Sequence, residues 1–130
     1  MPDSDEPLNI RISVESDETV ELLKERGYFD DAISAFRAAV CVAISLDLPV
    51  DASVPTPRNK WDTASVFRNT EANLEDVLLL MGVPREEVVN VGRLKGEAGL
   101  RYLRGKLTAN VDILPILVPG YLSDAYGDDE

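Results

Sequence analysis

The residues best suited to chemistry lie near the start of the chain, where Asn9, Arg11 and Ser13 alternate with apolar residues. Alternation over this length is typical of a strand with one face in the core and the other face free. On the free face a guanidinium suits guanine, a carboxamide suits adenine, and a hydroxyl discriminates little between bases. The pattern therefore predicts contact with base edges in a DNA groove. An edge strand without a ligand is the alternative.

A second group of candidates lies between residues 92 and 107, where five basic residues accompany one acidic residue. If this segment is helical, Arg93, Arg101 and Arg104 share a stripe with Glu97, beside an apolar stripe of leucines. We expect the apolar stripe to dock on the core and the basic stripe to face outward, where it can meet phosphate. For any single one of these residues, a solvated helix face is an equally good interpretation.

Two helices follow the strand and would position its outward face. The first is expected over about residues 17–26, because a capping residue precedes it and a glycine follows it. Asp30 or Asp31 can cap the second, which continues to the residue before Pro49. This second helix is apolar around nearly its whole circumference, and Cys41 within it is expected to be a small core residue.

The strand needs a partner, because an isolated strand leaves its backbone donors and acceptors unpaired. No second strand is evident before residue 49, so the partner must lie elsewhere in the chain or in a second copy. The apolar second helix likewise calls for cover on more than one side. Both features predict a homodimer or larger oligomer. A strand paired across a two-fold axis and followed by two helices resembles the ribbon-helix-helix family, whose ribbon enters the major groove.

The second half of the chain is expected to be mostly helical. A proline-rich loop leads into residues 61–67, which fit an extended piece or a short helical turn. Asn69 or Thr70 can cap a third helix, which Gly82 ends. The last helical pattern, over residues 88–107, contains four glycines that weaken it.

Length and composition indicate a single compact, mainly α-helical domain. The chain has 130 residues, of which 45% are hydrophobic, and it has no apolar run long enough to cross a bilayer. We expect flexible acidic tails at residues 1–7 and 120–130 and one domain over residues 8–119. That domain comprises a strand–helix–helix unit at 8–48 and a helical second half at 60–107. Because the start of the chain lacks the features of a secretory signal, we expect a cytoplasmic location and no membrane partner.

The net charge of −11 argues at first sight against nucleic acid, because phosphate binding normally needs a basic surface. However, 24 acidic residues against 13 basic residues is a balance found in proteins of salt-loving microbes. We therefore expect a halophilic source, in which the overall acidity serves solubility. On that interpretation, local basic patches carry the information about binding.

The sequence contains few residues of the types that most often act in catalysis. The chain has no histidine, the commonest general base and metal ligand, and Cys41 is its only thiol. The glycines at positions 92, 96 and 99 lack the strand–turn–helix context of a dinucleotide-binding motif. We expect a protein that is not an enzyme and has no cofactor and no metal site.

Several short motifs occur in an order and spacing that resemble one family. They are Ile10-Arg11-Ile12-Ser13, Leu23-Lys24 before Gly27, Arg37-Ala38, Ser45-Leu46, and Gly99-Leu100 with Leu103. Over residues 8–107 the chain resembles the DndE family of DNA sulfur modification (phosphorothioation) proteins. The resemblance implies a compact, mainly helical oligomer that binds DNA, with a preference for nicked duplex, and assists the sulfur-installing enzymes. Members of that family bind DNA through surface lysines, whereas this chain contains only four lysines in all: Lys24, Lys60, Lys95 and Lys106.

Three hypotheses follow. The first is a DndE-like accessory factor that uses Arg11 and the basic later segment for phosphate contact. The second is a ribbon-helix-helix repressor or antitoxin, whose outward strand residues recognise an operator. The third is an interaction subunit without nucleic-acid contact. Strongly sequence-specific binding would favour the second, and absence of binding at any salt concentration would leave the third.

Overall fold

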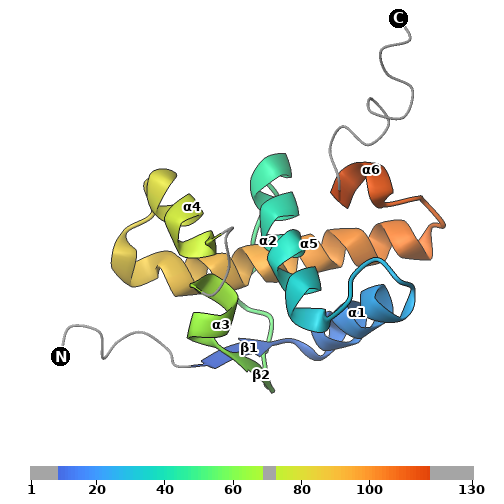
Figure 1. The fold of residues 1–130 in the computed structure, drawn as a ribbon, viewed down its shortest axis with the longest axis horizontal. Helices are drawn as coiled ribbons and strands as arrows, with labels where there is room; N and C mark the ends of the chain where they lie inside the picture. Colours follow the sequence, from blue (N-terminus) through green and yellow to red (C-terminus); the bar gives the residue numbers. More distant parts are fainter. Residues whose placement is uncertain (1–8, 69–72, 118–130) are drawn as a thin grey trace, which may run out of the picture.

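The computed structural model describes residues 9–68 and 73–117 (Figure 1). The predicted acidic tails at 1–7 and 120–130 lie outside these residues. The structure is a single compact, mainly helical domain with one short two-stranded sheet, which confirms the predicted class. Its elements are β1 (Asn9–Ile12), α1 (Val14–Glu25), α2 (Ala32–Leu46), β2 (Arg58–Asp62), α3 (Thr63–Phe67), α4 (Leu74–Leu80), the 3₁₀ turn η2 (Arg85–Glu87), α5 (Val88–Thr108) and α6 (Leu114–Leu117).

The core is organised around α5, a continuous helix of 21 residues that α2 crosses (Figure 1). Three of the four glycines that weaken the helical pattern, Gly92, Gly96 and Gly99, lie where α5 meets its neighbours. A Cβ atom at Gly99 would lie 2.0 Å from the carbonyl oxygen of Ala39 in α2, and one at Gly96 would lie 2.4 Å from the ring of Phe36. Close approach of α2 and α5 therefore offsets the poor helix propensity of glycine.

Capping residues set the starts of the helices. Asp31 caps α2 by accepting a hydrogen bond from the backbone N–H of Ser34 at 2.9 Å, so the predicted start of the second helix is confirmed. The helix ends at Leu46, before the predicted end at Leu48, because Asp47 adopts a left-handed conformation. In contrast, α1 begins three residues before the predicted 17–26, because Ser13 is its N-cap. The cap of α4 is Asn73, whereas the predicted caps Asn69 and Thr70 lie outside the described residues.

The partner of β1 is β2, from the same chain, in an antiparallel pair. Ile10 and Ile12 point into the core and are fully buried. Ile10 lies opposite Trp61, whose ring packs at 5.3 Å from that of Phe36. Of the two places predicted for a partner strand, the later part of the chain is the one found, so the strand itself needs no second copy.

One local prediction is wrong. Cys41 is exposed, because it lies on the side of α2 that α5 leaves uncovered near α6. Residues Leu114–Leu117 form the short helix α6, and Ile113 just before them is fully buried. No helix among the described residues combines the length and apolar character needed to cross a bilayer.

Candidate nucleic-acid interface

The outer face of the β1–β2 ribbon carries two of the three predicted base-contacting residues. Asn9 and Arg11 are both exposed, whereas their neighbours Ile10 and Ile12 are buried. The guanidinium of Arg11 donates from Nε to the carbonyl oxygen of Thr56 at 3.3 Å and from Nη2 to that of Pro57 at 2.9 Å. These bonds engage part of a five-donor group and fix its plane. Arg11 is thus both oriented and accessible.

Ser13, the third predicted residue, does not belong to this face. It is 6% exposed and turns inward, where its backbone N–H and its hydroxyl donate to the carboxylate of Glu97 at 2.7 and 2.8 Å. The strand ends before Ser13 because this residue caps α1, accepting from the N–H of Ser16 at 3.0 Å. Because it is buried, Ser13 does not share the exposed outer face of the ribbon with Asn9 and Arg11.

Glu97 lies in the core, although it was expected on an outward basic stripe. It is 3% exposed, and its carboxylate accepts hydrogen bonds from Ser13 and from the hydroxyl of Ser16 at 2.8 Å. The carboxylate therefore lies at the N-terminus of α1, where unpaired N–H groups and the helix dipole favour a negative charge. Glu97 links α5 to the junction between β1 and α1.

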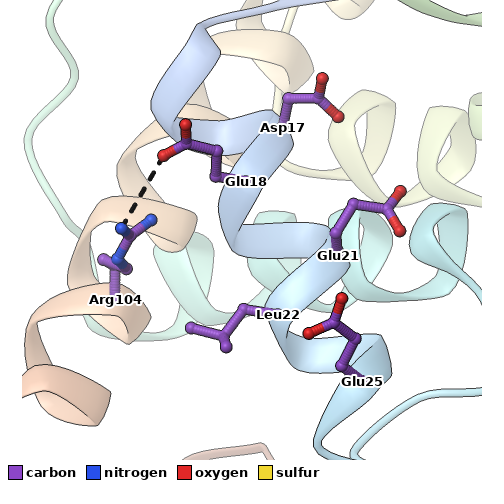
Figure 2. Close-up of a pocket in the computed structure, with 6 residues that line it drawn as sticks. All are labelled: Asp17, Glu18, Glu21, Leu22, Glu25 and Arg104. Carbon is purple, nitrogen blue, oxygen red and sulfur yellow. Dashed lines mark ion pairs between the residues drawn. The ribbon is translucent and has the colours of Figure 1, made fainter.

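The three arginines predicted for phosphate contact do not form one outward stripe on α5. Arg101 is exposed, whereas Arg93 donates to the Oδ1 of Asn90 at 3.0 Å. Arg104 turns toward α1, where it donates to the hydroxyl of Thr19 at 3.0 Å and lies 3.9 Å from Glu18 (Figure 2). Of the three, Arg101 remains the most accessible candidate for phosphate contact.

The cations of β2 are held by the acidic side of α1. Arg58 lies 2.7 Å from Asp17, and Lys60 lies 2.8 Å from Asp17 and 3.2 Å from Glu21. The hydrogen bond from Lys60 lowers the pKa of Asp17, against an opposing effect of burial. Burial disfavours the charge of Lys60, but its bonds to the two carboxylates prevail and raise its pKa. The two basic residues of β2 are thus already paired with carboxylates of the same chain.

The same side of α1 borders a shallow hollow of about 380 Å³ (Figure 2). Four carboxylates and a single guanidinium line it, together with one leucine: Asp17, Glu18, Glu21, Glu25, Arg104 and Leu22. The hollow is negative in character and would repel phosphate. Within residues 9–68 and 73–117, no group of three or more metal-binding side chains is placed to hold an ion.

A second hollow, of about 520 Å³, lies between α2, α5 and α6 and is mostly apolar. Its lining includes Cys41, Leu46, Tyr102 and Ile116. Partial burial raises the pKa of the Cys41 thiol, although the side chain still reaches the surface. The thiol is therefore protonated at neutral pH and a weak nucleophile.

The sequence pattern does not predict a site role for Asn59, an exposed residue of β2 that lies opposite Arg11. The segment Arg58–Asp62 lacks apolar alternation, since Trp61 is its only apolar residue. The requirement that β1 find a partner was the one feature that could have pointed to this segment.

No family model, curated protein or solved structure matches the chain. The resemblances to the DndE and ribbon-helix-helix families therefore stay predictions.

Proposed function

We propose that this protein is a non-catalytic, DNA-binding accessory protein of a DNA phosphorothioation system, and that the outer face of the β1–β2 ribbon contacts the DNA. The observation that carries the proposal is the placement of Arg11, which is exposed on the ribbon and oriented by the carbonyls of Thr56 and Pro57. A two-stranded ribbon fits the major groove, where a guanidinium can bind guanine with two hydrogen bonds.

The phosphorothioation part of the proposal rests on the motifs shared with the DndE family. Several of these motif residues serve the fold: Leu23 and Leu100 are fully buried, and Gly99 contacts α2. They support a shared core more directly than a shared activity. The motif at residues 10–13 is the one that includes an exposed residue of the ribbon, Arg11.

Electrostatics should make the binding weak and only slightly dependent on salt. Arg58 and Lys60 are paired with α1, and the chain as a whole carries a charge of −11. With one or two phosphate contacts, affinity should fall by roughly tenfold or less between about 50 and 200 mM salt. Hydrogen bonds to base edges would then supply most of the remaining affinity.

The test is a titration of intact, nicked and single-stranded DNA from low to high salt with wild-type protein and Arg11→Ala. If Arg11 binds a base, its loss should weaken binding by about 1–3 kcal/mol and relax the preference at one base pair. If it contacts only phosphate, binding should weaken similarly on all sequences. Arg101→Ala should show this second behaviour and flatten the salt dependence by about one counterion.

Arg26→Ala is the matched control for these titrations. Arg26 is an exposed arginine at the C-terminal end of α1, and its replacement removes the same charge as Arg11→Ala. Since α1 has 12 residues, this position lies about 18 Å along the helix from the end that adjoins the ribbon. Binding curves for Arg11→Ala that coincide with those of wild type on every substrate would refute contact through the ribbon.

A repressor or antitoxin is the second candidate, favoured by the amide and guanidinium groups of Asn9 and Arg11 on one exposed face. Such groups suit sequence-specific contact better than binding to nicks. A strong preference for one duplex sequence would support this candidate. The pairing of β1 with β2 means that its ribbon would come from one chain, unlike the ribbon of the ribbon-helix-helix family.

Self-association and contact with sulfur modification enzymes complete the proposal. Leu80 is 89% exposed and Met81 is 50% exposed at the end of α4, so an apolar patch is available for a protein contact. Light scattering in high salt over a range of protein concentrations should give a dimer or larger. A monomer at every concentration would contradict self-association without affecting the proposed DNA contact.

A further inference from the structure

Asn59 lies directly opposite Arg11 in the β1–β2 ribbon and is exposed. Residues that face each other across an antiparallel pair point to the same side of the sheet, with Cβ atoms about 4.5–5.5 Å apart. Since Arg11 points away from the buried Ile10 and Ile12, Asn59 belongs to the outer face as well.

A bulge in β2 makes this arrangement possible. The register passes from Arg11 opposite Asn59 to Ile10 opposite Trp61, so Lys60 has no partner in β1. A bulge of this kind redirects a side chain while the strand continues on both sides. Lys60 turns to Asp17 and Glu21, Trp61 turns to the core, and Asn59 keeps its place on the outer face.

The chemistry of Asn59 complements that of Arg11. A carboxamide offers one donor and one acceptor in the arrangement that matches the major-groove edge of adenine, as a guanidinium matches guanine. The cross-strand spacing of about 5 Å exceeds the rise of about 3.4 Å between stacked base pairs by less than the reach of an arginine or asparagine side chain. Two such side chains can therefore meet neighbouring base pairs.

We propose that Asn59 is a base-contacting residue that takes the place predicted for Ser13, so that Asn9, Arg11 and Asn59 form one recognition face within a single chain. This inference rests on the proposed DNA contact and adds the specificity of that contact. The ligand is duplex DNA with an adenine beside the guanine that Arg11 contacts. Because both strands of the ribbon belong to one chain, one copy suffices for this recognition face.

The test is selection of bound sequences from a pool of random duplexes by wild-type protein, Asn59→Ala and Asn90→Ala. Asn90 is an exposed asparagine on α5 and serves as the matched control. Wild type and Asn90→Ala should enrich the same sequence, with an A·T pair beside a G·C pair. Asn59→Ala should lose the preference at the A·T pair alone and bind the selected duplex roughly 5- to 150-fold more weakly.

Asn59→Asp sharpens the test. A carboxylate only accepts hydrogen bonds and prefers the amino group of cytosine, so the selected base at that position should change from adenine to cytosine. Circular dichroism and melting curves show whether each variant is folded. We expect both Asn59 variants to fold, because Asn59 is exposed. Selection of an unchanged sequence by Asn59→Ala would overturn the role of Asn59 while the DNA contact stands. Failure of wild type to bind any duplex would overturn the proposed function itself.

Discussion

The contact between α2 and α5 and the contact between α1 and β2 are built in opposite ways. At the first, Gly96 and Gly99 lack side chains where Phe36 and the backbone of Ala39 approach. At the second, carboxylates such as Asp17 reach basic side chains across a partly exposed surface. Added atoms cannot be accommodated at the first contact, whereas water and ions can replace partners at the second. The contact between α2 and α5 therefore fixes how the helices pack. The contact between α1 and β2 makes stability sensitive to pH and salt.

Gly99→Ala should have the largest effect. The added Cβ would lie 2.0 Å from the carbonyl oxygen of Ala39, and backbone cannot move aside as the end of a flexible side chain can. We expect a loss of about 3 kcal/mol in the free energy of unfolding, at the upper end of the range for overpacked cores. Urea unfolding monitored by circular dichroism measures this loss.

Gly105→Ala is the control on the same helix. Nothing lies within 4 Å of a Cβ atom built at Gly105, so the change affects helix propensity alone. It should raise stability by about 0.5–1 kcal/mol. Equal effects of the two substitutions would show that propensity, and not the approach of α2, governs the glycines of α5.

Glu97→Gln should have an intermediate effect, because Glu97 combines the burial of the first contact with the charge of the second. Its carboxylate accepts three hydrogen bonds, including one from the backbone N–H of Ser13. A carboxamide accepts at one atom only, and its NH₂ group must face donors or force them to turn. We expect a loss of about 1–3 kcal/mol in the free energy of unfolding. Glu25→Gln, on the exposed end of α1, should leave the unfolding curve nearly unchanged.

Asp17→Asn should have a smaller effect that depends on pH. Because the hydrogen bond from Lys60 lowers the pKa of Asp17 in the folded protein, its ionised form favours folding above the ordinary value of 3.8. At neutral pH the free energy of unfolding of the wild type should exceed that of Asp17→Asn by about 0.2–1 kcal/mol. This difference should disappear as the pH falls through the lowered pKa. Unfolding midpoints of both proteins over a series of pH values test this, and a difference that persists in strong acid would contradict it.

High salt should affect the stability of the two contacts differently, and this is the smallest of the expected effects. In molar salt the Debye length falls to about 3 Å, comparable with the 2.7 and 2.8 Å that separate Asp17 from Arg58 and Lys60, so salt weakens these pairs without abolishing them. The stability difference between wild type and Asp17→Asn should shrink, whereas the loss caused by Gly99→Ala should stay constant. Parallel shrinkage of both differences would mean that the α2–α5 contact also has an electrostatic component.

Much of the fold follows from local patterns in the sequence. Asp31 as a capping residue and the apolar positions after it predict α2, and alternation predicts the buried Ile10 and Ile12. The glycines of α5 counted against a helix because propensity is a local property, whereas the fit of Gly96 and Gly99 against α2 is a contact between distant segments. The strand β2 escaped prediction because it takes its conformation from pairing with β1.

The candidate site was predictable only in part, for a similar reason. Exposure of Asn9 and Arg11 follows from their alternation with buried residues. The inward turn of Ser13 depends on the carboxylate of Glu97, which lies 84 positions later in the chain. Likewise, the engagement of Arg104 by Thr19 joins two helices that no local pattern relates. Residue types thus indicate the available chemistry, and long-range contacts decide which side chains remain accessible.

The glycines of α5 also have a consequence for how the chain folds. Each glycine inside a helix costs about 1 kcal/mol relative to alanine, and α5 contains four of them among its 21 residues. A helix of this composition has little stability by itself, so a peptide of residues 88–108 should be largely unstructured in water. The helix must form as it docks on α2, which couples two distant parts of the chain in one step. Folding of this domain is therefore cooperative at its centre, and its longest helix is a product of tertiary contact and not its starting point.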